Sequence, residues 1–364
     1  MATKGSSRRV IPLPGAVVIV ATVIVATLVL GAQPVGAHGV GGVEPSNYET
    51  TIHGLEPPTG TVEVTLRDVG DSIELRADPG VEVVVLGYDG EPYLWFTGDG
   101  VSENRNSPAV YLNRSRDATE GAPPEYDSDA EPDWQRISTG HTATWHDHRA
   151  HWMGASDPKA VRDDPGTRRV VVENWEIPLL VDGDLVLVTG DVTWVPGPAV
   201  WPWLLLSLTL LVVAVALGRT RFWPRVLAVG LVALVIVETA HIVGLWIGTS
   251  GALLDKLGAN VYSALGLALG VYALIRLLHR SDPYDATPAV LVAALVLCVA
   301  GGLADLSTLT SSQLPTVLAG PVARLGVATS VGAGAGVATV AAMRLRRPGD
   351  RSTRRAARLR GRTT

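Results

Sequence analysis

The sequence contains a single cysteine, Cys298, which falls in an apolar segment of the 364-residue chain. An intramolecular disulfide is therefore impossible, and the segments outside a membrane can hold neither a thiolate zinc site nor a cysteine nucleophile. The chain also lacks a serine-centred or paired-carboxylate arrangement that would give an independent sign of catalysis. It has no cytoplasmic segment long enough for a kinase or DNA-binding domain. We therefore predict no nucleic-acid partner, and the sequence gives no positive reason to expect an enzyme.

The hydropathy of the chain places it between soluble and wholly membrane-embedded proteins. Hydrophobic residues make up 47% of the sequence, and the mean hydropathy is +0.26. The N-terminus has basic residues, then an apolar run over residues 16–30, then small residues ending at Ala37. This pattern is typical of a secretory signal peptide, predicted at residues 1–37 with cleavage after Ala37. An uncleaved signal anchor is the alternative.

Charge divides the chain into two halves. Residues 38–199 contain 29 acidic and 11 basic side chains, a net charge of −18. From residue 200 onward the balance reverses, and the tail over residues 344–364 is rich in arginine. An acidic surface keeps an exported domain soluble and raises the local concentration of cations. The arginine tail favours contact with cytoplasmic lipid headgroups over contact with nucleic acid.

The acidic half is predicted to form β-strands. Short stretches rich in Val, Ile and Leu alternate with Gly and Asp turn residues. Strands at this spacing favour an immunoglobulin-like β-sandwich over residues 38–199, interrupted by an acidic, proline-bearing loop at residues 117–133. The expected strands are Thr61–Val69, Ser72–Ala77, Val81–Tyr88, Tyr93–Phe96, Arg169–Trp175, Ile177–Val181 and Leu185–Val195.

The second half, residues 200–343, contains apolar runs of about 20 residues, the length that crosses a bilayer. Arginines flank the runs on alternate sides, so the positive-inside rule puts the β domain outside the cell and the C-terminus in the cytoplasm. We therefore predict a multi-pass plasma-membrane protein with five spans, in contact with the lipid bilayer. The expected spans are Val200–Leu217, Val226–Ile247, Leu257–Leu278, Pro288–Leu306 and Val317–Met343.

Four of the eight histidines lie between residues 141 and 153. If residues 145–149 are extended, His146 and His148 project from one face and Asp147 from the other. If a helical turn follows, His148 meets His151 at i, i+3. His141 lies farther away and is expected to support the site from outside. Two or three imidazoles can thus converge, and neutral imidazole is the commonest protein metal ligand.

Three further residues extend this predicted metal site. Asp147 would either bind the ion or orient a histidine ring, and Met153 offers a thioether. Cleavage after Ala37 would make His38 the first residue of the mature protein, where its α-amine and ring nitrogen could chelate one ion; the alternative is a simple polar residue. A nitrogen-rich set with a thioether favours copper over calcium or magnesium, and zinc is the second choice. The alternative without a metal is a group of histidines that hydrogen-bond a polar loop.

Four ionisable residues fall inside or beside the predicted spans: Glu238, His241, Asp305 and Arg324. All four are expected at similar depth on the outer side, with Asp305 paired to Arg324. Ionisable groups in a membrane are costly and commonly face the bundle interior or a pathway. They indicate either a site that accepts a metal ion or proton below the external domain, or a polar network that fixes helix packing.

The Ala37-His38 junction, the sandwich pattern and the layout of one domain before several spans together resemble bacterial copper-handling proteins of the CopC/CopD and YcnI-like types. The Trp145-His146-Asp147-His148 and His151-Trp152-Met153 segments look like a motif of uncharacterised actinobacterial membrane proteins that is associated with such systems. The five predicted spans are fewer than in the CopD type. The resemblance implies a copper role and partners among copper-handling envelope proteins, and assigns no transport function.

The leading functional hypothesis is therefore a membrane-anchored, extracytoplasmic copper-binding protein that captures, delivers or detoxifies copper. The first alternative is a membrane-bound metalloenzyme that uses the same histidines, which requires an open coordination position. The second is an envelope sensor or interaction module whose histidines respond to pH.

Overall fold

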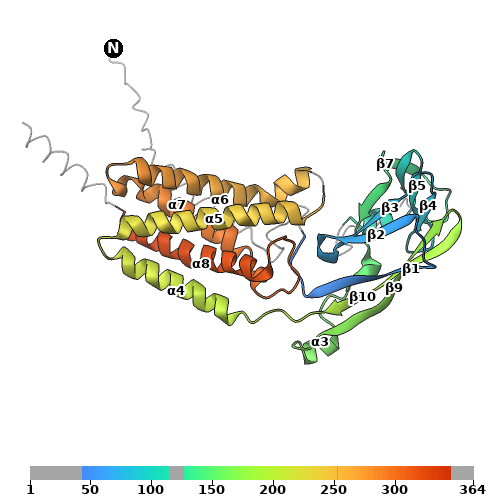
Figure 1. The fold of residues 1–364 in the computed structure, drawn as a ribbon, viewed down its shortest axis with the longest axis horizontal. Helices are drawn as coiled ribbons and strands as arrows, with labels where there is room; N and C mark the ends of the chain where they lie inside the picture. The colour runs from blue at the N-terminus through green and yellow to red at the C-terminus, as the bar shows by residue number, and fades with distance from the viewer. Residues whose placement is uncertain (1–42, 115–126, 252, 346–364) are drawn as a thin grey trace, which may run out of the picture.

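A computed structural model describes residues 43–114, 127–251 and 253–345. The predicted signal peptide, His38 and the arginines from Arg346 onward lie outside the described residues. Within the described part, an antiparallel β domain precedes a bundle of long helices and sits at one end of it (Figure 1). The chain thus has the two-part layout that the hydropathy pattern predicts.

In the described residues, the β domain consists of two antiparallel sheets. The larger sheet has the strand order β1-β10-β9-β4-β5-β6-β7, and the smaller has the order β2-β3-β8. Short helices α2 (Ala109–Leu112) and α3 (Lys159–Asp163) connect strands at the rim. The strands are β1 (Tyr48–Glu56), β2 (Val62–Arg67), β3 (Ser72–Ala77), β4 (Val83–Leu86), β5 (Pro92–Thr97), β6 (Gly100–Asn104), β7 (Trp134–Ser138), β8 (Thr142–Trp145), β9 (Arg169–Val181) and β10 (Asp184–Trp194).

One hydrophobic core joins the two sheets. Ile73 and Leu75 of the small sheet are buried in the same cluster as Val83, Phe96 and Ile177 of the large sheet. The strands show the period-2 alternation that a half-buried strand requires; in β3, for example, Ile73, Leu75 and Ala77 point inward. Burial of these side chains, at about 1.5–3 kcal/mol each, is the main favourable term for this domain, which has no disulfide.

The sequence predicted the strongest strands of this domain. Expected strands overlap β2, β3, β4, β5 and β10, while the two expected strands at 169–175 and 177–181 form the single strand β9. β1, β6, β7 and β8 were not predicted. β7 and β8 are only five and four residues long, so their apolar alternation is too short to stand out.

The described residues also contain five helices long and apolar enough to cross a membrane, which confirms the predicted number. Helix α8 lies at the centre and is mostly buried, whereas α4 is the most exposed of the five (Figure 1). The helices are α4 (Trp201–Gly218), α5 (Trp223–Gly248), α6 (Leu253–His279), α7 (Thr287–Cys298) and α8 (Gly320–Met343); α7 follows the 3-10 turn η3 (Pro283–Ala286) and continues into the π-helical segment η4 (Val299–Leu303).

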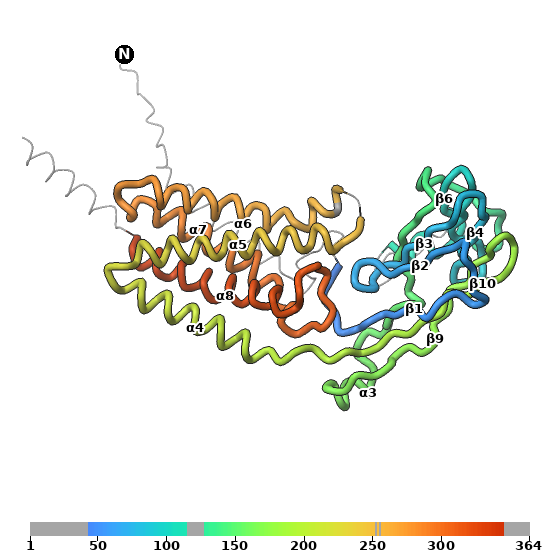
Figure 2. The backbone as a smooth tube through the Cα atoms, viewed as in Figure 1, coloured from blue at the N-terminus to red at the C-terminus, as the bar shows by residue number. Residues whose placement is uncertain are grey.

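The β domain lies at the end of the bundle (Figure 2), and hydrogen bonds among the described residues join the two parts, including those that follow. Ser46 exchanges backbone hydrogen bonds with Gln313, at 3.0 and 2.9 Å. The Ser312 N–H donates to Asn47 Oδ1 at 2.8 Å, and the Ser250 N–H donates to Asp68 Oδ1 at 2.5 Å. The face of the β domain that carries Asp68 therefore lies against the end of α5.

Candidate metal centre

The pairing of β3 with β8 places one carboxylate beside the histidine cluster. Ile73 pairs with Trp145 in this antiparallel ladder. Asp71, just before β3, is therefore a neighbour of His146, just after β8. Only this tertiary pairing brings residues 71 and 146 together, since 75 positions separate them in the chain.

A short turn then returns His151 to the same place. After His146 the chain forms the 3-10 turn η2 (His148–Ala150), which Asp147 caps through a hydrogen bond from the Arg149 N–H to Asp147 Oδ1 at 3.1 Å. The turn closes with the His151 N–H donating to the His148 carbonyl at 3.3 Å. As a result, the His151 ring stacks on the His146 ring with 4.3 Å between centroids and 9° between planes.

Asp71, His146 and His151 form the one group in the described residues whose potential metal-binding side-chain atoms all lie within 4.8 Å of one another. The His146 Nδ1–H donates to the Asp71 backbone carbonyl at 2.6 Å, and the His151 Nε2–H donates to the same oxygen at 3.1 Å. The Asp71 carboxylate is also close, with Oδ2 3.7 Å from His146 Nδ1. The two ring nitrogens that face the Asp71 carbonyl therefore carry protons, and the Asp71 carboxylate lies beside them.

The second ring nitrogen of His146 supports a bound cation. Because a carbonyl can only accept, the bond to Asp71 places the proton of neutral His146 on Nδ1 and leaves a lone pair on Nε2. Nε2 is buried and has no hydrogen-bond partner among the described residues. A buried acceptor without a donor is costly, and histidines that bind metals commonly have their other nitrogen fixed by a carbonyl in this way. The residues present therefore fit a transition-metal ion.

His148 lies beside this group without belonging to it. Its ring centroid is 5.1 Å from that of His146, at 72°, and 6.1 Å from the Tyr88 ring. Its backbone N–H donates to the Tyr88 hydroxyl at 3.0 Å. The sequence predicts His146 beside His148 or, after a helical turn, His148 beside His151, whereas the structure stacks His146 on His151 across the η2 turn.

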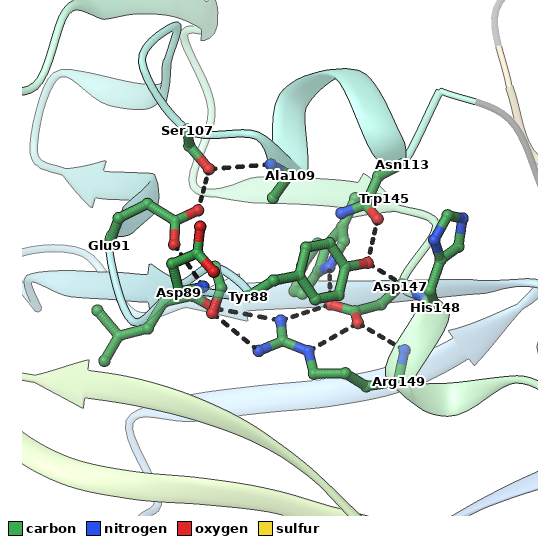
Figure 3. Close-up of polar contacts among 12 residues, drawn as sticks. Tyr88, Asp89, Glu91, Ser107, Ala109, Asn113, Trp145, Asp147, His148 and Arg149 are labelled. Atoms are coloured by element: carbon green, nitrogen blue, oxygen red, sulfur yellow. Dashed lines mark hydrogen bonds and ion pairs between the residues drawn. The ribbon is translucent and has the colours of Figure 1, made fainter. Parts of the chain in front are cut away.

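Asp147 is not part of the group formed by Asp71, His146 and His151. The Asp147 side chain is fully buried and belongs to a hydrogen-bonded network, drawn in Figure 3. Arg149 donates to both of its carboxylate oxygens at 2.9 and 2.8 Å, and the Trp145 indole N–H donates at 3.0 Å. Burial alone would raise the pKa of the Asp147 carboxyl, but the bonds and charge of Arg149 outweigh it and lower the pKa.

The same network holds the backbone of the η2 turn against the end of β4. Arg149 also donates to the carbonyls of Leu86 and Gly87, at 3.1 and 3.3 Å, and so connects η2 to the end of β4. The Tyr88 hydroxyl hydrogen-bonds Asn113, and burial together with the Asp147 charge raises the Tyr88 pKa, so Tyr88 stays neutral (Figure 3). The backbone that carries His146 and His148 is therefore held from below by buried polar bonds.

Two other predicted site residues lie away from the cluster. His141 precedes β8, and its carbonyl accepts from the Ala77 N–H at 3.0 Å, so it sits at the opposite end of β8 from His146. Five residues of extended chain separate the two histidines by roughly 15 Å. Met153 lies beyond the turn with 43% of its surface exposed. The structure thus removes a thioether and a supporting histidine from the immediate group.

The loop that presents Asp71 has an unusual backbone. Asp68, Val69 and Gly70 all have positive φ angles, of 54°, 60° and 88°. A β-branched residue such as Val69 rarely adopts this conformation, which costs of order 1–3 kcal/mol and is found chiefly at ligand-binding or switching positions. His151 and Asp71 line a small cleft together with the acidic residues Glu44 and Asp68. This negative surrounding attracts cations.

The four ionisable residues of the bundle are arranged differently from the prediction. Asp305 does not pair with Arg324; instead its Oδ2 lies 3.5 Å from His241 Nε2. Arg324 donates to the backbone carbonyls of Thr308 and Ser311, at 3.2 and 2.7 Å. The carbonyls at the end of the loop between η4 and α8 thus satisfy the guanidinium, and Asp305 turns toward α5.

No family model, curated protein or solved structure matches this chain. The structure itself defines the protein as a β domain with a His₂Asp cluster, joined to a bundle of helices that are long and apolar enough to cross a membrane. Sequence reasoning missed Asp71, because its role depends on the β3–β8 pairing and no local motif marks it.

Proposed function

We propose that the protein is a membrane-anchored metal-binding protein whose extracytoplasmic β domain holds one transition-metal ion between Asp71, His146 and His151. The observation that carries this proposal is the convergence of these three side chains within 4.8 Å, next to a buried imidazole nitrogen that has no hydrogen-bond partner in the described part of the chain. The acidic cleft beside them draws cations toward the site.

The metal that best suits this set is Cu²⁺. Nitrogen and oxygen ligands without sulfur favour Cu²⁺ over Cu⁺, and a given site binds Cu²⁺ more tightly than Zn²⁺ in the order of divalent first-row metals. The resemblance to CopC/CopD and YcnI-like proteins points to the same metal. We also propose that the protein is exported through a signal peptide that ends at Ala37. We propose in addition that the two sheets form an immunoglobulin-like sandwich. His38 would then be a candidate further ligand.

The test is metal analysis of the purified full-length chain in detergent. Wild type is expected to bind about one Cu²⁺ per chain in a competition titration, with a Cu²⁺ EPR signal split by imidazole nitrogens. The double variant His146→Ala/His151→Ala should lose this binding. The matched control is His53→Ala, which removes an exposed histidine of β1 that pairs with Asp191 at 3.1 Å. Unchanged Cu²⁺ binding in the double variant would overturn the proposal.

A further inference from the structure

A buried carboxylate lies inside the bundle, separate from the β domain. Glu238 sits near the middle of α5 and is fully buried. Neither of its carboxylate oxygens has a hydrogen-bond partner of standard geometry among residues 43–114, 127–251 and 253–345; the Ser263 side chain of α6 is its polar neighbour. A charged carboxylate in such an apolar place is costly unless a cation or proton neutralises it.

The fold reserves space for this carboxylate. Gly301 lies in η4, where the helix widens to the π form. A Cβ atom at Gly301 would come within 2.0 Å of Glu238 Oε2, so any side chain there would displace the carboxylate. π-helical segments of this kind are frequent at functional sites. The position of the Glu238 carboxylate is therefore determined by two elements, α5 that carries it and η4 that leaves space for it.

Two more ionisable groups, Asp305 and His241, lie near Glu238. Asp305, which is 3% exposed, lies close enough for its charge to act on Glu238. Asp305 Oδ2 in turn lies 3.5 Å from His241 Nε2. These three side chains do not converge as the β-domain cluster does, because in the described residues only Asp71, His146 and His151 bring three ligand atoms within 4.8 Å. Neighbouring proton acceptors that do not converge on one point suit a proton better than a chelated metal ion.

Few charges surround these three side chains. Arg324 of α8 is a basic group at this end and is bonded to two backbone carbonyls, and Lys256 of α6 lies at the last turn of α5, where it donates to the Trp246 carbonyl at 3.1 Å. Helix α6 contributes the uncharged Ser263, and α7 contributes Cys298, whose thiol hydrogen-bonds the Val331 carbonyl at 3.6 Å. Two carboxylates and one guanidinium leave a single negative charge, with the imidazole neutral. One bound proton makes the group neutral, which an apolar bundle favours.

A cavity beside His241 and Asp305 reaches the β-domain side of the bundle. Its volume is about 190 Å³, and its wall includes Gly301, Asp305 and His241. Most of the remaining wall is apolar, and Pro45, from the segment just before β1, lines it as well. Pro45 is followed by Ser46, which lines the cleft that contains Asp71 and His151. The cavity thus extends from His241 and Asp305 to the segment just before β1.

We propose that His241, Asp305 and Glu238 form a proton-binding relay at the β-domain end of the bundle. A proton entering through the cavity binds a ring nitrogen of His241, passes to the Asp305 carboxylate and then to Glu238, which becomes a neutral carboxylic acid. Only N–H and O–H bonds form and break, and no electron is transferred. The relay does not depend on a metal ion in the β domain.

The test is infrared difference spectroscopy of the full-length protein in lipid nanodiscs, titrated from about pH 5 to about pH 9. Wild type is expected to show the C=O band of a protonated carboxylic acid that disappears as the pH rises. Glu238→Gln, which keeps the shape of the neutral acid, should remove the band. The matched control is Glu173→Gln, at an exposed carboxylate of β9, which should keep it. A band that persists in Glu238→Gln overturns the relay.

The pH dependence of thermal unfolding gives a second test of the relay. A proton held in the folded state stabilises that state at low pH, so the unfolding midpoint of wild type should fall as the pH rises, and that of Glu238→Gln should fall less. Zn²⁺ titration of the His146→Ala/His151→Ala variant checks the competing ligand. If that variant binds Zn²⁺ and the further change Glu238→Gln abolishes the binding, the bundle site holds a metal ion and the proton relay is wrong.

Discussion

At the scale of single residues, the ion pair of Asp147 and Arg149 holds the backbone of the histidine segment in place. Asp147 is fully buried and the Arg149 side chain is largely buried, and Asp147 accepts four hydrogen bonds from Arg149 and Trp145. Removing one member of a buried pair leaves the other charge without compensation. The pair therefore contributes to the position of His146 without touching the proposed ion.

Asp147→Asn should lower the free energy of unfolding of the β domain by about 3 kcal/mol, because Arg149 stays buried without its counter-charge. The measurement is urea unfolding of the full chain followed by tryptophan fluorescence. The control is Asp163→Asn, which breaks an exposed pair with Lys159 and should cost less than about 1 kcal/mol. Equal losses in the two variants would contradict the structural role of Asp147.

The two histidines that follow Asp147 should differ in their effect on metal binding. His151→Ala should weaken Cu²⁺ binding by at least about tenfold, since His151 belongs to the group whose ligand atoms lie within 4.8 Å of one another, whereas His148→Ala should change it by less than about threefold. Competition titration of the single variants measures both. A larger loss in His148→Ala would support the pairing of His146 with His148 that alternation predicts.

The candidate site was only partly predictable at this scale. Period-2 alternation correctly separates His146 from Asp147, because it is a property of extended backbone alone. The roles of Asp71 and His151 depend on the β3–β8 register and on the direction of the η2 turn, which tertiary contacts decide. The predicted pairing of Asp305 with Arg324 differs from the structure for a similar reason. The sequence does not show that backbone carbonyls of a loop accept the hydrogen bonds of Arg324.

At the scale of elements, the helices α4 and α8 approach unusually closely. A Cβ atom at Gly332 would lie 2.3 Å from the Ser207 carbonyl oxygen, and one at Gly336 would lie 2.7 Å from the Ala214 Cβ. The Ser207 hydroxyl crosses the contact and donates to the Ala328 carbonyl at 3.0 Å. Small residues spaced four apart allow this approach, in which van der Waals packing holds helices together within lipid.

Gly332→Val should separate α4 from α8 and lower the thermal unfolding midpoint of the detergent-solubilised protein by several degrees, because the contact is with backbone that cannot rotate away. Fluorescence-detected size exclusion after heating measures the midpoint. Thr339→Val, on an exposed face of the same helix, is the control and should leave it nearly unchanged. A midpoint for Gly332→Val equal to that of the control would mean that the bundle tolerates a wider α4–α8 spacing.

The helices were easier to predict than the strands for a physical reason. A span needs about 20 apolar residues in succession, and such runs are rare by chance. Strands β6, β7 and β8 are four or five residues long and partly exposed, so their pattern is brief and depends on which neighbours cover them. The predicted helices therefore agree with the structure more closely than the predicted strands do.

At the scale of the whole molecule, the strained loop at Asp68–Gly70 joins the two parts. Asp68 receives hydrogen bonds from both the backbone N–H and the hydroxyl of Ser250, just beyond α5. Three positions later, Asp71 faces the histidines. Helix α5 also carries Glu238 and His241, so a single loop connects the proposed metal site to the helix of the proposed relay.

Asp68→Ala should release this loop from α5, because it removes two hydrogen bonds to a charged acceptor. Amide hydrogen exchange over residues 68–71 and at Ser250 is expected to accelerate by at least about tenfold, since each such bond contributes about 1.5–3 kcal/mol. Mass spectrometry of the full chain in detergent measures the exchange. Asp78→Ala, at an exposed turn after β3, is the control and should exchange like wild type.

Because Asp71 loses its fixed position in Asp68→Ala, the Cu²⁺ affinity of that variant should fall together with the protection of its amides from exchange. Faster exchange with unchanged affinity would show that the metal site is set by β3 and β8 alone, and unchanged exchange would show that the Ser46–Gln313 and Asn47–Ser312 contacts hold the two parts without Asp68.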